Sequence, residues 1–104
     1  FNLESVREAI RRLDLQPSET FVELGAGHGA GLRGIAELKH QPKRIVCVEI
    51  SDDFRRELEK TIDELPPEYN IEVHREDCKS MPYLADASVD KIFGMNVVHV
   101  YFLD

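Results

Sequence analysis

Apolar residues recur with two different periods along the 104-residue chain, which predicts an alternation of helices and strands. Residues 3–13 and 51–65 carry apolar side chains at intervals of three and four, the spacing of an amphipathic helix. Arg44–Val48 is almost wholly apolar, which is typical of a strand buried on both faces of a parallel sheet. The pattern therefore predicts an α/β fold.

Two later segments complete the predicted sheet. Asn70–Arg75 alternates apolar and polar side chains, which predicts a half-exposed third strand near an edge of the sheet. Asp90–Val98 is mostly apolar and predicts a fourth strand. The chain shows no internal repeat or linker, so we expect one domain over residues 1–104, incomplete at its C-terminal end.

The most distinctive stretch follows the first predicted strand. A short run with apolar Phe21, Val22 and Leu24 leads into glycine at every second position, Gly25, Gly27 and Gly29, and a helical pattern follows. Strand, tight turn and helix in this order open a nucleotide-binding βα unit. Because the start of a helix presents free N–H groups and a partial positive charge, we expect an anionic or strongly polar group to bind there.

An acidic residue stands where such folds bind ribose. Glu49 ends the second predicted strand, 24 positions after Gly25. A carboxylate at this point can accept hydrogen bonds from both ribose hydroxyls. The alternative is an ordinary solvated strand end, but the glycine loop upstream favours the ribose role.

Composition excludes several classes of function. The net charge of −7 argues against a nucleic-acid partner, because binding to phosphates relies on clustered Lys and Arg. No apolar run is long enough to predict a membrane span, and no signal peptide is visible at the start of the chain. Two cysteines without a secretory signal predict reduced thiols and a cytoplasmic location. The four histidines lie far apart in sequence, so no metal site is expected.

Four stretches, in order, resemble the signatures of class I S-adenosylmethionine-dependent methyltransferases: Glu23–Gly29, Val48–Ser51, Glu76–Cys78 and Met81–Asp90. The last stretch is closest to the small-molecule methyltransferases related to the quinone-biosynthesis enzymes. The resemblance implies a Rossmann-like parallel sheet in the order 3-2-1-4 with helices on both faces, truncated relative to the seven strands of that family. It covers most of the chain.

The resemblance also implies roles for individual residues in binding the cofactor. Glu23 would bind the ammonium group, Glu49 the ribose hydroxyls, and Ile50 would pack against the adenine. The remaining implied contacts are Gly25, Ala26, Gly27 and Gly29 around the methionine part, Asp77 and Cys78 at the adenine, and Asn96 beside the departing methyl group. No catalytic residue is assigned. His28 could contact the cofactor carboxylate, and His99 or Tyr101 could hold a base, but ordinary loop positions are the favoured explanation for all three.

The chemistry of S-adenosylmethionine suits these residues. The cofactor carries a sulfonium, an ammonium and a carboxylate but no phosphate, so three acids (Glu23, Glu49 and Asp77) match its two positive centres. The expected function is methyl transfer to a small-molecule acceptor. Asn96 is followed by Val97–His99 rather than the Pro-Pro-aromatic run of methyltransferases that act on DNA amines, which disfavours that substrate class.

Two alternatives remain open at the level of sequence. The first is a fragment of an NAD- or FAD-binding oxidoreductase, because Gly25, Gly27 and Ala30 satisfy the looser dinucleotide fingerprint. The second is a non-catalytic, truncated methyltransferase fold that binds a partner. In either a fragment or a truncated domain, the fourth strand would be an exposed apolar edge, through which the chain could self-associate.

Overall fold

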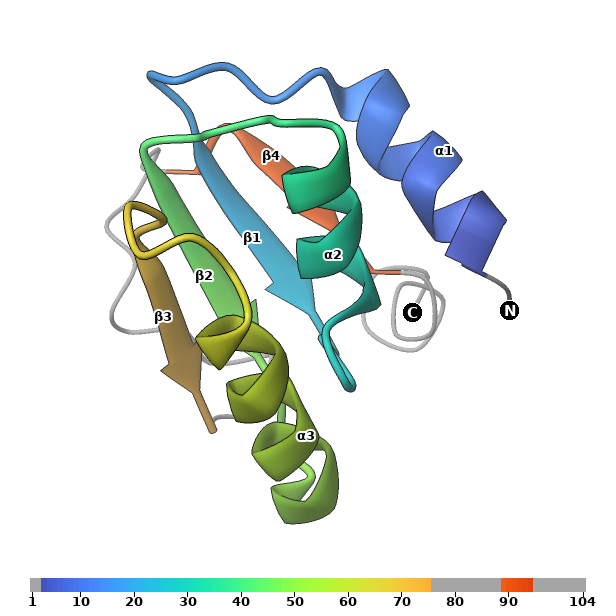
Figure 1. Cartoon of the computed structure of the whole chain (residues 1–104), viewed down its shortest axis with the longest axis vertical. Coiled ribbons are helices and arrows are strands. Elements are labelled where there is room, and N and C mark those ends of the chain that lie inside the picture. The colour runs from blue at the N-terminus through green and yellow to red at the C-terminus, as the bar shows by residue number, and fades with distance from the viewer. Residues whose placement is uncertain (1–2, 76–88, 95–104) are drawn as a thin grey trace, which may run out of the picture.

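The computed structural model of the chain describes residues 3–75 and 89–94, and within them it contains one parallel sheet. Four strands lie in the order β3-β2-β1-β4, which confirms the predicted order (Figure 1). The strands are β1 (Thr20–Leu24), β2 (Arg44–Val48), β3 (Ile71–His74) and β4 (Lys91–Phe93). The helices are α1 (Leu3–Leu13), α2 (Ala30–Glu37) and α3 (Asp52–Asp63).

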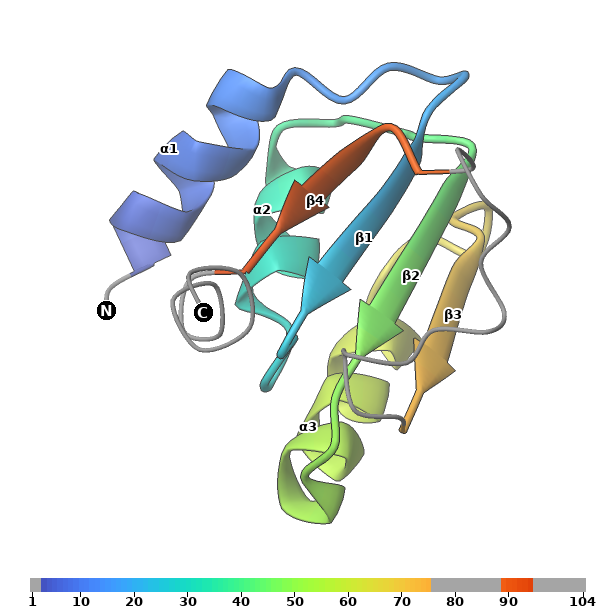
Figure 2. The ribbon, with the colours of Figure 1, turned by 180° about the vertical axis from the view of Figure 1, so that it is seen from behind.

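The two central strands send apolar side chains to both faces of the sheet. Phe21 and Ile45 belong to a core cluster that also contains residues of all three helices. Successive side chains of a strand point to opposite faces, so their neighbours on the same strands, including Val22 and Val46, form a second cluster on the other face. The helices in the described part of the chain lie on the first face (Figures 1 and 2). The described residues form no helix on the second face, so the expectation of helices on both faces stays a prediction there.

Helix α3 begins as the sequence predicts but buries a different set of side chains. Ser51 caps it, since its hydroxyl accepts from the backbone N–H of Phe54 at 3.3 Å. The spacing within residues 51–65 places Phe54 and Leu58 on one apolar stripe and predicts that both are core residues. Leu58 is fully buried, but the prediction is wrong for Phe54, which is 50% exposed. The first turn of α3, to which Phe54 belongs, extends beyond the carboxyl ends of the strands (Figure 1). Thr61 is buried instead.

The edges of the sheet are formed by β3 and β4. All four residues of β3 are partly exposed, which confirms the prediction of a half-exposed strand near an edge. Strand β4 spans Lys91–Phe93, and the rest of the predicted strand beyond residue 94 lies outside the described residues. Ile92 is 48% exposed on this edge, and self-association through it stays a prediction. None of the described helices is long and apolar enough to cross a membrane.

Candidate cofactor site

The glycine loop joins β1 to α2 at the carboxyl ends of the two central strands. Its three glycines have positive φ angles: 65° at Gly25, 58° at Gly27 and 96° at Gly29. The backbone N–H groups of Gly25 and Ala26 both donate to the carbonyl of Val48, at 2.8 and 3.2 Å. The last residue of β2 therefore holds the start of the loop, and L side chains rarely adopt the backbone conformation of the three glycines.

Glu49 connects this loop to helix α3. Its side chain is 6% exposed, and its Oε1 accepts from the N–H of Gly27 at 2.6 Å. Its Oε2 accepts from the N–H of Ser51 at 3.0 Å. The structure thus places Glu49 in direct contact with the glycine loop, whereas the sequence linked the two only by their separation along the chain. Each carboxylate oxygen retains a further lone pair, so both can still accept from a ribose hydroxyl.

Glu23 is a buried acid that forms no ion pair with any residue that the structure describes. It is 5% exposed, and within the described part of the chain its Oε1 has no hydrogen-bond partner. Burial, followed by repulsion from Glu49, raises the pKa of Glu23 to about 8. A buried acid of this kind is costly unless a cation or a donor reaches it. The arrangement therefore fits a ligand that brings a positive group to the glycine loop.

Gly31, in the first turn of α2, leaves the space that the Glu23 carboxyl group occupies. A Cβ built on Gly31 would lie 2.5 Å from both carboxyl oxygens. The sequence analysis missed Gly31, although a glycine inside a helix costs roughly 1 kcal/mol and so invites a specific explanation. The close approach of helix backbone to carboxyl group is that explanation.

Replacing Gly31 by alanine should destabilise the protein by about 1–3 kcal/mol, because the new methyl group displaces a buried carboxyl group. The free energy of unfolding in urea measures the effect. Gly34→Ala is the matched control on the same helix, since its Cβ would meet no atom closer than 3.6 Å and helix propensity favours the change. In a Glu23→Ala background the penalty at Gly31 should shrink to the level of the control; an unchanged penalty would contradict the proposed contact.

The other predicted site residues fall into two groups. Ile50 is next to Glu49 and 63% exposed, so its side chain is accessible to an adenine ring. Ala26 is buried in the loop, while the carbonyl of His28 accepts from the Thr61 hydroxyl at 2.7 Å. The predicted contacts that lie outside the described residues are Asp77, Cys78 and Asn96, together with His99 and Tyr101.

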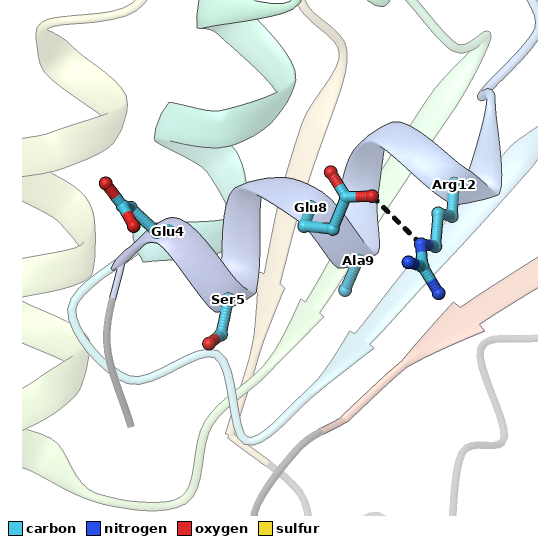
Figure 3. Close-up of a pocket in the computed structure, with 5 residues that line it drawn as sticks. All are labelled: Glu4, Ser5, Glu8, Ala9 and Arg12. Atoms are coloured by element: carbon cyan, nitrogen blue, oxygen red, sulfur yellow. Dashed lines mark hydrogen bonds and ion pairs between the residues drawn. The ribbon is translucent and has the colours of Figure 1, made fainter.

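Two other features of the described residues bear on where a ligand could bind. A surface cavity runs along α1, lined by Glu4, Ser5, Glu8, Ala9 and Arg12 (Figure 3). None of the described candidate residues lines it, and the Glu8 carboxylate there is paired with exposed arginines of its own helix. Across residues 3–75 and 89–94, no group of three or more His, Cys, Asp or Glu side chains could hold a metal ion.

Fold and site together define a nucleotide-binding type of α/β domain, with a glycine loop and buried acids at the carboxyl end of a parallel sheet. Residues 21–104 match a protein family described as a methyltransferase domain. The chain therefore belongs to this methyltransferase family, and S-adenosylmethionine is the cofactor of the class it resembles. No curated protein is similar enough in sequence to count as a match.

Solved structures share the fold at low sequence identity. The YcgJ protein from Bacillus subtilis superposes with a TM-score of 0.76 at 16% identity, over 97% of this chain and 41% of its own. A putative S-adenosylmethionine-dependent methyltransferase from Methanococcus maripaludis superposes with a TM-score of 0.71 at 20% identity, over 98% of this chain and 44% of its own. The 23S rRNA methyltransferase ErmE superposes with a TM-score of 0.73 at 18% identity, over 100% of this chain and 40% of its own. The chain thus spans about two fifths of the length of these proteins.

Proposed function

We propose that this chain is the cofactor-binding part of an S-adenosylmethionine-dependent methyltransferase that acts on a small-molecule acceptor. The observation that carries the proposal is the buried carboxyl group of Glu23, at the end of β1 beside the glycine loop, whose Oε1 has no hydrogen-bond partner in residues 3–75 and 89–94. An ammonium group at this point would stabilise the ionised form of Glu23, which no cation among the described residues stabilises.

Each part of the cofactor has a counterpart in the site. The ammonium group would pair with Glu23, and the ribose hydroxyls would donate to Glu49, whose oxygens keep free lone pairs. The exposed side chain of Ile50 would cover the adenine. A Cβ on Gly27 would meet no atom within 4 Å, so open space lies above the loop where the methionine part would pass.

The role of these residues in the reaction is to bind and orient. The bound cofactor supplies a methyl group on a positively charged sulfur, which departs as a neutral thioether. The protein has to hold acceptor, methyl group and sulfur in line, and such orientation can supply several kcal/mol of the barrier. Glu23 and Glu49 would fix the two ends of the cofactor, and so fix where its methyl group points.

The acceptor class is proposed from charge. The chain has a net charge of −7, which disfavours a polyanionic acceptor. One structural neighbour acts on 23S rRNA, but at 18% identity it shares the fold alone. A small molecule without phosphates is the acceptor that suits this chain best.

Binding titrations test the proposal against the oxidoreductase alternative. S-adenosylhomocysteine should bind, and should raise the melting temperature as any ligand of the native state does, whereas NAD and FAD should do neither. The reason is that Glu23 and Glu49 attract an ammonium group and repel a pyrophosphate. Binding of NAD without binding of S-adenosylhomocysteine would overturn the proposal in favour of the oxidoreductase. Binding of neither ligand would favour the non-catalytic module.

A further inference from the structure

Thr61, on the third turn of α3, contacts the far end of the glycine loop. Its side chain is buried, and its hydroxyl donates to the carbonyl of His28 at 2.7 Å. Its methyl group lies where a side chain on Gly29 would be, because a Cβ built there would be 2.8 Å from Thr61 Cγ2. Nothing in the sequence pattern pointed to this residue, since it lies among polar positions of the helix.

The hydroxyl of Thr61 is oriented by a neighbour from another helix. The Nη2 group of Arg33, on α2, donates to Thr61 Oγ1 at 3.1 Å and lies 3.7 Å from a carboxylate oxygen of Glu64. A hydroxyl that accepts from a guanidinium has its own proton left for a carbonyl. The His28 carbonyl is the nearer of two such acceptors, the other being Glu57 of the same helix at 3.2 Å.

The peptide group between His28 and Gly29 is therefore held at both ends. Its C=O accepts from Thr61 at 2.7 Å, and its N–H donates to the carbonyl of Ala26 at 3.1 Å. The orientation of this peptide plane sets the φ of 96° at Gly29, the residue that caps α2. It thereby sets the direction in which the loop enters the helix.

The opposite side of the glycine loop is held by residues at the start of α3, the helix that carries Thr61. Glu49 accepts from Gly27 of the loop and from Ser51, the cap of α3. Helix α3 thus supports the loop at two points, through the acid beside its first turn and through Thr61 two to three turns later. A shift of α3 along its axis would change both contacts together.

We propose that Thr61 is a positioning residue for the cofactor: through the His28 carbonyl it fixes the glycine loop in the conformation that binds the nucleoside. The inference rests on the proposed function, since it concerns the affinity of the same site. Thr61 itself touches no part of the cofactor in this account and acts only through the loop backbone.

The test compares Thr61→Val, which keeps the shape and removes the hydroxyl, with Thr61→Ser, which keeps the hydroxyl. Thr61→Val should weaken binding of S-adenosylhomocysteine about tenfold, the usual effect of one lost hydrogen bond of about 1–1.5 kcal/mol, and Thr61→Ser should bind within about threefold of wild type. Thr20→Val is the matched control, because Thr20 is equally buried but lies at the other end of β1. Wild-type affinity in Thr61→Val would overturn the inference.

A second readout separates this inference from the proposed function. Hydrogen exchange of the Gly29 amide, measured without ligand, should be faster in Thr61→Val than in wild type or Thr20→Val, because the peptide group loses one of its two anchors. Arg33→Met, a change at a half-exposed position, should accelerate the same amide to a smaller extent. If wild type bound no S-adenosylhomocysteine, the proposed function would fail, and unchanged exchange at Gly29 would independently refute the role of Thr61.

Discussion

Replacing Glu23 by glutamine should weaken the binding of S-adenosylhomocysteine by about 30-fold or more, because a buried partner of the ammonium group loses its charge. The same change should stabilise the ligand-free protein at pH 8. The isosteric amide fills the same space below Gly31 and carries no charge to desolvate. Opposite effects on affinity and stability are the signature of a group kept for binding.

The pH dependence of stability follows from the raised pKa of Glu23. The pKa of Glu23 is raised from 4.5 to about 8 in the folded protein, so between these values the folded state keeps a proton that the unfolded state has lost. Through Glu23, the free energy of unfolding therefore falls as the pH rises from about 4.5 to about 8, and falls no further above that. Urea unfolding at pH 5, 7 and 9 should show this decline in wild type and a smaller one in Glu23→Gln.

Ligand binding should show the opposite trend. Because the ammonium group pairs with the ionised acid, the affinity of wild type for S-adenosylhomocysteine should rise between pH 6 and pH 8, and that of Glu23→Gln should not. Glu59→Gln, an exposed change on α3, serves as the control for both measurements. Equal affinity and equal pH dependence in wild type and Glu23→Gln would contradict the role given to Glu23.

Replacing Glu49 by alanine should greatly lower both the stability of the protein and its affinity for S-adenosylhomocysteine. The N–H groups of Gly27 and Ser51 lose their acceptor, which should cost about 2–4 kcal/mol of stability. The affinity for S-adenosylhomocysteine should fall about 100-fold, since the ribose loses its acceptor and the loop loses a support. Isothermal titration and urea unfolding measure the two effects.

Glu49→Gln separates the two roles of this acid. The amide keeps one oxygen for a backbone N–H but presents an NH₂ group to the other, so stability and affinity should lie between those of wild type and Glu49→Ala. Asp53→Ala, in the exposed first turn of α3, controls for the loss of a nearby negative charge. If Glu49→Ala changed stability and affinity no more than Asp53→Ala does, Glu49 would be an ordinary solvated residue at the end of a strand.

The placement of Glu49 could be predicted from sequence because it follows from general rules, whereas the strand order is implied only by the resemblance to class I methyltransferases. The almost wholly apolar run at β2 is typical of a strand buried on both faces of a parallel sheet, and the carboxyl ends of parallel strands meet at one edge. An acid directly after β2 and a glycine loop directly after β1 must then lie side by side. The hydrogen bond from Gly27 to Glu49 is the direct consequence.

The contacts that sequence could not supply depend on three-dimensional approach. The periodicity of α3 places Phe54 and Leu58 on one stripe, but it does not encode that the first turn of the helix extends beyond the strands (Figure 1), where Phe54 is exposed. Thr61 and Gly31 act through atoms that are distant in sequence, at Gly29 and Glu23. That Glu23 Oε1 meets no hydrogen-bond partner among the described residues likewise depends on what surrounds it in three dimensions, which no spacing of residues encodes.

The most direct measurement is a crystal structure of the protein with S-adenosylhomocysteine bound. We expect the ligand ammonium group within hydrogen-bond distance of Glu23 and the ribose hydroxyls on Glu49, with the methionine part lying along Gly25–Gly29. A nucleoside bound elsewhere on the protein, with Glu23 still unpartnered, would contradict the account.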